Sequence, residues 1–218
     1  MKKTVVYIDG FNLFYRALKG TSHKWLDIHA LCVAALPKSC DIVAIKYYTA
    51  RVSGAINPHS PKYQQAYLNA LGSLSLVSTY FGSFQVTEKM AYLAVPLSFY
   101  PAPTSPVYPA PRFAKIVKTE EKGSDVNLGV HLVRDAFMGA FEQAAILTND
   151  TDLVEPVRIV TAEANLPVYL LTPVSKPAHG LKSLACGVRH ISPYLGISQF
   201  PDPVIRLDGK VVAKPPGW

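Results

Sequence analysis

The sequence AAILTNDTDL (residues 144–153) runs from four apolar residues into a turn that carries two carboxylates, Asp150 and Asp152. A short apolar run bounded by turn residues is typical of a strand buried in a parallel sheet. A carboxylate at the end of a buried strand loses hydration, which costs free energy unless a positive group lies beside it. We therefore expect a buried strand here, ending in a charged site that needs a cation.

Outward from this strand, apolar strands alternate with helix patterns along the whole chain. The run TVVYI is rich in β-branched residues and ends in the turn DGFN. Such alternation predicts a three-layer α/β fold, in which a parallel sheet carries helices on both faces. We expect one domain over residues 1–218, with residues 193–218 as a C-terminal extension. The expected strands are 4–8, 41–50, 74–82, 143–148, 166–173 and 188–192, and the expected helices are 26–36, 60–72, 123–139, 152–164 and 175–186.

Residues 83–117 interrupt this alternation, because no helix pattern falls between Gly82 and Lys118. Two strand-like flanks, FQVTEKMAYLAV and RFAKIVK, enclose the proline-rich stretch PAPTSPVYPAP (101–111). Dense proline favours an extended path. We expect an inserted β-hairpin arm with a stiff tip, and a disordered surface loop is the alternative. The arm is expected to shape substrate access or to hold a second subunit, and a homodimer is the favoured role.

The chain is basic, with 22 Lys and Arg against 15 Asp and Glu, a formal charge of +7 and a pI near 9.3. This balance favours a polyanionic partner such as nucleic acid, although a generically basic protein would look the same. The three cysteines lack CxxC spacing, which argues against disulfides and structural zinc. No apolar run approaches the roughly 18 residues that span a bilayer. We expect a cytoplasmic protein that makes no membrane contact.

Two more carboxylates, Asp9 and Asp125, fall where the expected strands end or the helices begin. Asp9 follows the strand 4–8, Asp150 and Asp152 follow 143–148, and Asp125 begins the helix 123–139. In a parallel sheet all these positions share one edge, where such folds bind ligands. Each Asp alone could be a turn former or a helix cap. Together, close carboxylates repel one another, so a hard cation such as Mg²⁺ or Mn²⁺ is expected among them.

The segments YIDGFNLFY (7–15), KGSDVNLGVHLVRDAF (122–137) and ILTNDTDL (146–153) resemble the three acidic motifs of the NYN domain. The likeness is greatest to its LabA-like branch, within the PIN-like nuclease superfamily, and it covers residues 4–173. The resemblance implies a PIN-like, Rossmann-like sheet and a metal-dependent ribonuclease-type site. It matches the acidic positions to Asp9, Asp125, Asp150 and Asp152. The third motif departs from the common Ser-Gly-Asp, because Thr148 supplies the hydroxyl and Asn149 replaces glycine.

These observations favour a metal-dependent nuclease that hydrolyses phosphodiester bonds, with single-stranded RNA favoured over DNA. A non-catalytic nucleic-acid or protein-binding module and a site for a small phosphorylated molecule are the alternatives. Asp9, Asp125 and Asp150 are the expected Mg²⁺ or Mn²⁺ ligands, and Asp152 is a further catalytic residue, as a ligand or a water-orienting base. The expected substrate-binding residues are Asn12, Thr148, Asn149, Lys122 and Ser124, and Lys118 and Arg51 are further candidates for phosphate contact.

Overall fold

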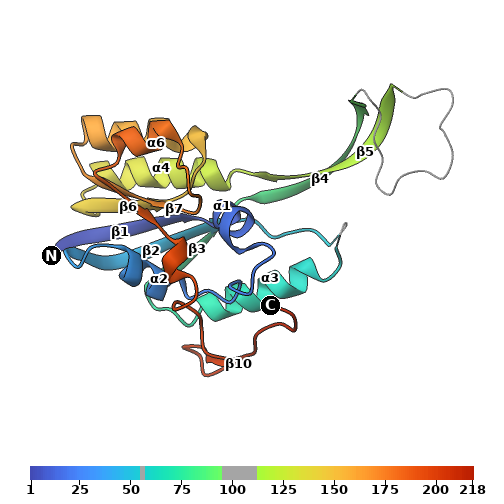
Figure 1. Cartoon of the computed structure of the whole chain (residues 1–218), viewed down its shortest axis with the longest axis horizontal. Helices are drawn as coiled ribbons and strands as arrows, with labels where there is room; N and C mark the ends of the chain where they lie inside the picture. The colour runs from blue at the N-terminus through green and yellow to red at the C-terminus, as the bar shows by residue number, and fades with distance from the viewer. Residues whose placement is uncertain (55–56, 95–111) are drawn as a thin grey trace.

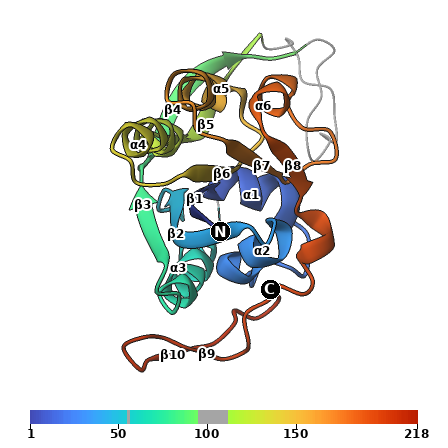
Figure 2. The ribbon, with the colours of Figure 1, turned by 90° about the vertical axis from the view of Figure 1, so that its left-hand side faces the viewer.

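The computed structural model describes residues 1–54, 57–94 and 112–218. Its centre is a six-stranded, fully parallel sheet with the strand order β3-β2-β1-β6-β7-β8 (Figures 1 and 2). This confirms the expected α/β sheet. The strands are β1 (Lys2–Asp9), β2 (Cys40–Thr49), β3 (Val77–Phe81), β6 (Gln143–Leu147), β7 (Val168–Thr172) and β8 (Gly187–His190).

Helices cover both faces of the sheet and make it the middle of three layers (Figure 2). Side chains alternate along β1, so Val6 and Ile8 enter one core while Val5 and Tyr7 enter the other. One layer holds α1 (Gly10–Leu13), the π-helical turn η1 (Phe14–Leu18), α2 (Ile28–Ala35) and α3 (Ser60–Leu71), and the other holds α4 (Ser124–Phe137), α5 (Val154–Arg158), the π-helical turn η3 (Ile159–Glu163) and α6 (His179–Leu184).

The order of the strands places a topological switch point between β1 and β6. The chain turns from β1 toward β2 and β3 on one side, and from β6 toward β7 and β8 on the other. Ile8 pairs with Leu147, so Asp9 and Thr148 lie next to each other beyond the strand ends. In folds of this kind, ligands bind at the carboxyl edge at such a switch point.

The inserted segment forms an antiparallel hairpin, β4 (Ser83–Tyr92) with β5 (Phe113–Lys122), that extends away from the body (Figure 1). It leaves the sheet at the carboxyl edge, because β3 ends at Phe81 and α4 begins at Ser124. Gly82 closes the base of the arm. A Cβ at Gly82 would lie 2.5 Å from the carbonyl oxygen of Lys122. The proline-rich stretch 101–111, where we expect the tip, lies outside the described residues.

The residues expected to form a C-terminal extension pack against the α2 and α3 side of the body. They include the 3₁₀ turn η4 (Ser192–Tyr194) and a small hairpin of β9 (Val204–Ile205) and β10 (Val211–Val212) (Figure 1). Phe200 is buried in the core below the sheet. The indole nitrogen of Trp25 donates to the carbonyl oxygen of Pro201 over 3.0 Å. None of the helices in the described ranges is both long and apolar enough to span a membrane.

Candidate functional site

Asp9 lies at the centre of the candidate site, at the end of β1. It caps α1: its Oδ1 accepts from the N–H of Asn12 over 2.9 Å, and its Oδ2 accepts from the Thr148 hydroxyl over 3.0 Å. Only 8% of Asp9 is exposed. Burial raises the pKa of Asp9 to about 6 although both hydrogen bonds lower it, and the nearby charges of Asp150 and Glu121 raise it further. The site therefore contains a carboxylate whose charge is poorly compensated.

The turn after β6 holds Asp150 close to this carboxylate. The Thr148 hydroxyl, which donates to Asp9, also accepts from the N–H of Asp150 over 3.0 Å. Asp150 in turn accepts from the N–H of Asp152 over 3.1 Å and caps a 3₁₀ turn, η2 (Thr151–Leu153). Thr148 is fully buried. Its role is to orient the two acidic turns rather than to face solvent.

Asn149 replaces the glycine that is common at this position of the motif, and its side chain makes a specific contact. Its Oδ1 accepts from the N–H of Ala178 over 2.7 Å, at the start of α6. Its own N–H donates to the side-chain oxygen of Asn12 over 3.0 Å. Asn12 and Asn149 therefore connect α1, the β6 turn and α6. The turn accommodates asparagine and uses its amide as a cross-link.

Asp125 and Asp152 line a different hollow, a groove of about 610 Å³ between α4 and α5. Asp125 accepts from the N–H of Val126 over 2.9 Å. Within the described ranges, no group of three or more Asp, Glu, His or Cys side chains is placed to hold a metal ion. The structure thus brings Asp9 and Asp150 together, and Asp125 is not grouped with them in a three-carboxylate centre. The hard oxygens and the uncompensated charge of Asp9 suit a divalent cation held mainly by these two residues and water.

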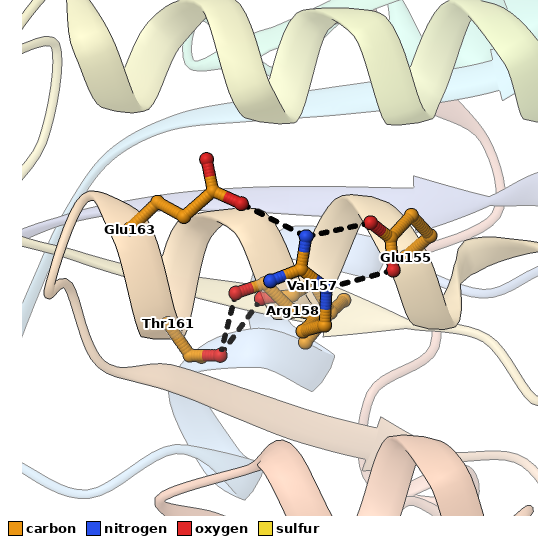
Figure 3. Close-up of polar contacts among 5 residues, drawn as sticks. All are labelled: Glu155, Val157, Arg158, Thr161 and Glu163. Atoms are coloured by element: carbon orange, nitrogen blue, oxygen red, sulfur yellow. Dashed lines mark hydrogen bonds and ion pairs between the residues drawn. The ribbon is translucent and has the colours of Figure 1, made fainter.

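Glu155 lines this groove, and its carboxylate is paired with Arg158 behind it on α5 (Figure 3). The guanidinium of Arg158 donates to both carboxylate oxygens of Glu155, over 2.8 and 2.7 Å, and to Glu163 over 2.8 Å. The Thr161 hydroxyl donates to the carbonyl oxygen of Val157 over 3.0 Å (Figure 3). Hydrogen bonding to Arg158 lowers the pKa of Glu155. Arg158 is therefore already neutralised, and it is a poor candidate for binding phosphate.

The basic residues near the base of the arm also have protein partners. Lys118 and Lys122 both pair with Glu120, the latter over 3.4 Å. Ser124 is buried, and its N–H donates to a carboxylate oxygen of Glu121 over 2.8 Å. Phosphate contact by Lys122 and substrate contact by Ser124 stay predictions. Arg51 donates to Gln65 over 2.7 Å and stacks on Phe81.

Two features at or near the candidate site were not predicted from the sequence. Glu121 contributes a charge that acts on Asp9, and its only sequence signal is its place at the end of a strand that leads into an acidic motif. The second feature is a buried network below the site, in which Asp135 on α4 accepts from the Tyr7 hydroxyl over 2.6 Å and pairs with Lys46. Lys46 is the single cation of β2 and lies in its middle, which could have indicated a buried partner.

A second cavity, of about 600 Å³, opens beside Gly10 on the α1 and α3 side of the site. Its walls combine aromatic, aliphatic and polar side chains, and Lys19 and Lys24 are among its lining residues. A Cβ at Gly10 would lie 2.6 Å from the ring of Tyr47 and 2.7 Å from the carbonyl oxygen of Tyr48. Glycine is therefore required where α1 crosses β2. This close crossing makes the cavity the immediate neighbour of Asp9.

Together, the fold and the site define a doubly wound, fully parallel α/β protein with an acidic switch point. No family model matches the chain. The chain is 29% identical over 198 residues to 6-hydroxy-3-succinoylpyridine 3-monooxygenase HspA of Pseudomonas putida (strain DSM 28022 / S16), an alignment that covers 79% of this chain and 60% of that protein. This chain thus spans less than two thirds of that relative. The fold is also similar to a solved protein of unknown function from Vibrio parahaemolyticus RIMD 2210633, with a TM-score of 0.54, 14% identity and coverage of 86% of this chain and 91% of that one.

Proposed function

We propose that the protein is a metal-dependent nuclease that hydrolyses phosphodiester bonds, with single-stranded RNA as the favoured substrate. The observation that carries this proposal is Asp9, a carboxylate buried at the switch point, beside Asp150 and without a cationic partner among the described residues. A buried carboxylate of this kind is stabilised by a positive charge. The resemblance of the three acidic segments to NYN-domain motifs supports the same reading.

In this proposal, Asp9 and Asp150 bind Mg²⁺ or Mn²⁺, and Asp125 and Asp152 act from the adjoining groove. Such an ion, when bound, would lower the pKa of a water molecule and offset the charge that develops on the phosphate. The protein's own groups do the positioning. The Thr148 hydroxyl bonds to both the Asp9 carboxylate and the N–H of Asp150, and so holds the two residues beside each other. The hydrogen bond between Asn12 and Asn149 holds the segment after β1 against the turn after β6. Asp152, at the start of the groove, is suited to orient water.

The basic character of the chain supports a polyanionic substrate. The formal charge is +7, and an edge crevice admits an unstacked strand more readily than a duplex. The proposal is tested by incubating the whole chain with labelled single-stranded RNA, single-stranded DNA and free nucleotides, with Mn²⁺ or with a chelator. We expect cleavage of RNA that requires Mn²⁺ and slows steeply as salt rises. Tight RNA binding without any cleavage would instead identify a non-catalytic nucleic-acid module.

A second candidate function is an enzyme acting on a small aromatic substrate. The name of the Pseudomonas putida relative describes a monooxygenase of a substituted pyridine, and the aromatic cavity beside Gly10 has a size suited to one such ring. This candidate is tested by measuring dioxygen uptake with hydroxypyridines, a reduced nicotinamide and added flavin. Uptake that depends on the pyridine would support it, and uptake equal to that of the buffer would reject it.

A further inference from the structure

Several aromatic rings line the cavity beside Gly10. The rings of Phe11 and Tyr15 are stacked, with centroids 6.2 Å apart and planes 15° apart, and Phe84 from the base of the arm continues the series 6.5 Å from Phe11. On another side, Tyr63 meets Trp218 edge to face at 6.0 Å. Walls of this kind favour a planar aromatic ligand over an aliphatic one, because rings gain from stacked and edge-to-face contacts.

The cavity also carries positive charge that the protein leaves unneutralised. The ammonium of Lys19 lies 5.1 Å from the ring centroid of Tyr15, and that of Lys24 lies 5.9 Å from the ring of Trp218. In the part of the chain that the structure describes, neither lysine pairs with a carboxylate, and no Asp or Glu lines the cavity. Residues 55–56 and 95–111 contain no acidic residue either. A cationic, aromatic cavity is complementary to an anion attached to a ring.

We propose that this cavity binds a planar aromatic ring that carries a carboxylate or a phosphate. The ring contacts the aromatic side chains that line the cavity, Tyr15 and Trp218 among them, and the anionic group faces Lys19 and Lys24. The volume of about 600 Å³ is sufficient for one such molecule or one nucleotide of a strand. The chemistry is shared by a nucleotide and by an aromatic carboxylic acid. Neither Asp9 nor Asp150 lines the cavity, so this proposal stands whether or not the acidic residues hydrolyse RNA.

The experiment is a calorimetric titration of the whole chain with two matched pairs of compounds. One pair is adenosine 5′-monophosphate and adenosine, and the other is nicotinate and nicotinamide. We expect the charged member of at least one pair to bind at least ~10-fold more tightly than its neutral partner, since the lysines supply the charge contact. The pair that binds more tightly identifies the source of the ligand, a nucleotide or an aromatic acid.

Variants locate the binding in the cavity. Trp218→Leu removes an aromatic wall and Lys24→Met removes a charge while keeping an apolar stem, so each should weaken binding at least ~10-fold. Lys182→Met, an exposed lysine on α6 across the sheet, is the matched control and should bind as the wild type does.

The proposal is overturned if none of the four compounds binds at millimolar concentration, or if Lys24→Met and Trp218→Leu bind as tightly as the wild type. Each variant is first compared with the wild type by circular dichroism and melting temperature. If Trp218→Leu fails to fold, the double variant Lys19→Met/Lys24→Met decides the question, because Lys19 is exposed, Lys24 is half-buried and neither lies in the core. Unchanged affinity in that variant would reject the site.

Discussion

Asp9 is buried without a cation, so its ionised form should destabilise the metal-free protein. Folding raises its pKa from 3.8 to about 6. The folded state therefore holds the proton more tightly than the unfolded state, and stability is lost as pH rises through this interval. We expect metal-free Asp9→Asn to be more stable than the wild type at pH 8, by about 2 kcal/mol as an order of magnitude. Below pH 4 the difference should vanish.

Urea unfolding of the two proteins between pH 3.5 and pH 8, with a chelator present, measures this difference. A gap that is constant across the range would contradict the account, because it would show that the substitution acts through contacts other than charge. Asp41→Asn, an exposed acid at the start of β2 and so at the opposite edge of the sheet, is the control and should show no such trend.

The buried network below the site should depend strongly on Asp135. Its carboxylate pairs with Lys46 and accepts from the Tyr7 hydroxyl, and the Lys46 ammonium also lies 5.7 Å from the rings of Tyr7 and Tyr80. Asp135→Asn leaves the half-buried Lys46 without a counter-charge, and we expect a loss of about 3 kcal/mol of unfolding free energy. Chemical unfolding measures this loss.

Glu88→Gln, which breaks the exposed pair with Lys115, is the control and should cost less than about 1 kcal/mol. Equal losses in the two variants would contradict the distinction between the buried and the exposed ion pair.

At the scale of the element, the turn after β6 depends on Asn149. Asn149→Gly restores the residue common in the motif but removes the acceptor for the Ala178 N–H and adds backbone freedom. We expect unfolding free energy to fall by about 1 to 2 kcal/mol, measured by urea unfolding at pH 7. Asn165→Gly, at a residue that already has a φ of 54°, is the control and should be neutral or stabilising. An unchanged Asn149→Gly protein would show that the cross-link carries no stability.

Most helices and strands were predictable because each is decided locally. The helical segment of α1 and η1 was not, because DGFN at residues 9–12 has the composition of a turn. Asp27, for example, accepts from the N–H groups of His29 and Ala30 where the helix pattern begins, and the apolar alternation of residues 4–8 decides both faces of β1. Placing Asp9 next to the turn of Asp150 also followed from strand ends alone. The partners of these acids did not follow. Whether Asp125 lies close to Asp9 and Asp150 depends on where the start of α4 is placed relative to the carboxyl edge of the sheet. No local sequence pattern determines that placement.

The aromatic cavity is the largest feature that the sequence did not predict. Its walls come from α1, α3, the arm and residues 216–218, which lie far apart in the chain. Each of its tyrosines and phenylalanines, taken singly, fits ordinary packing in a half-buried position. The cavity therefore depends on tertiary structure, which no motif or residue spacing in the sequence predicts. Glu121 is similar, because its effect on Asp9 depends on where the arm meets the sheet.

At the scale of the whole molecule, the arm presents an apolar face that the body does not cover. Alternation along the ribbon places Val86, Met90 and Tyr92 of β4 on the same face as Phe113 and Val117 of β5, and all five are exposed. The charged residues on this face in the described part of the arm include Glu88 and Lys115, which pair with each other. A two-stranded ribbon is marginally stable alone, and an exposed apolar face of this kind suits a second copy of the chain.

We therefore expect a dimer through the arm, with about twice the 23.8 kDa mass of the chain by light scattering. The double variant Val86→Lys/Val117→Lys should shift the mass to that of the monomer while leaving the circular dichroism of the body unchanged. Thr87→Lys, which places the same charge on the opposite face of β4, is the matched control and should remain dimeric. A monomeric wild type at micromolar concentration would show that the arm serves another purpose.

The central claim is that Asp9 belongs to a metal-dependent site for phosphodiester hydrolysis, and one comparison tests it most directly. Labelled single-stranded RNA is incubated with wild-type, Asp9→Asn and Asp41→Asn proteins, each loaded with Mn²⁺ and free of contaminating nuclease. Because metal binding and charge stabilisation carry such chemistry, Asp9→Asn should cleave at least ~100-fold more slowly, and Asp41→Asn should match the wild type. Cleavage by Asp9→Asn at the wild-type rate would contradict the account.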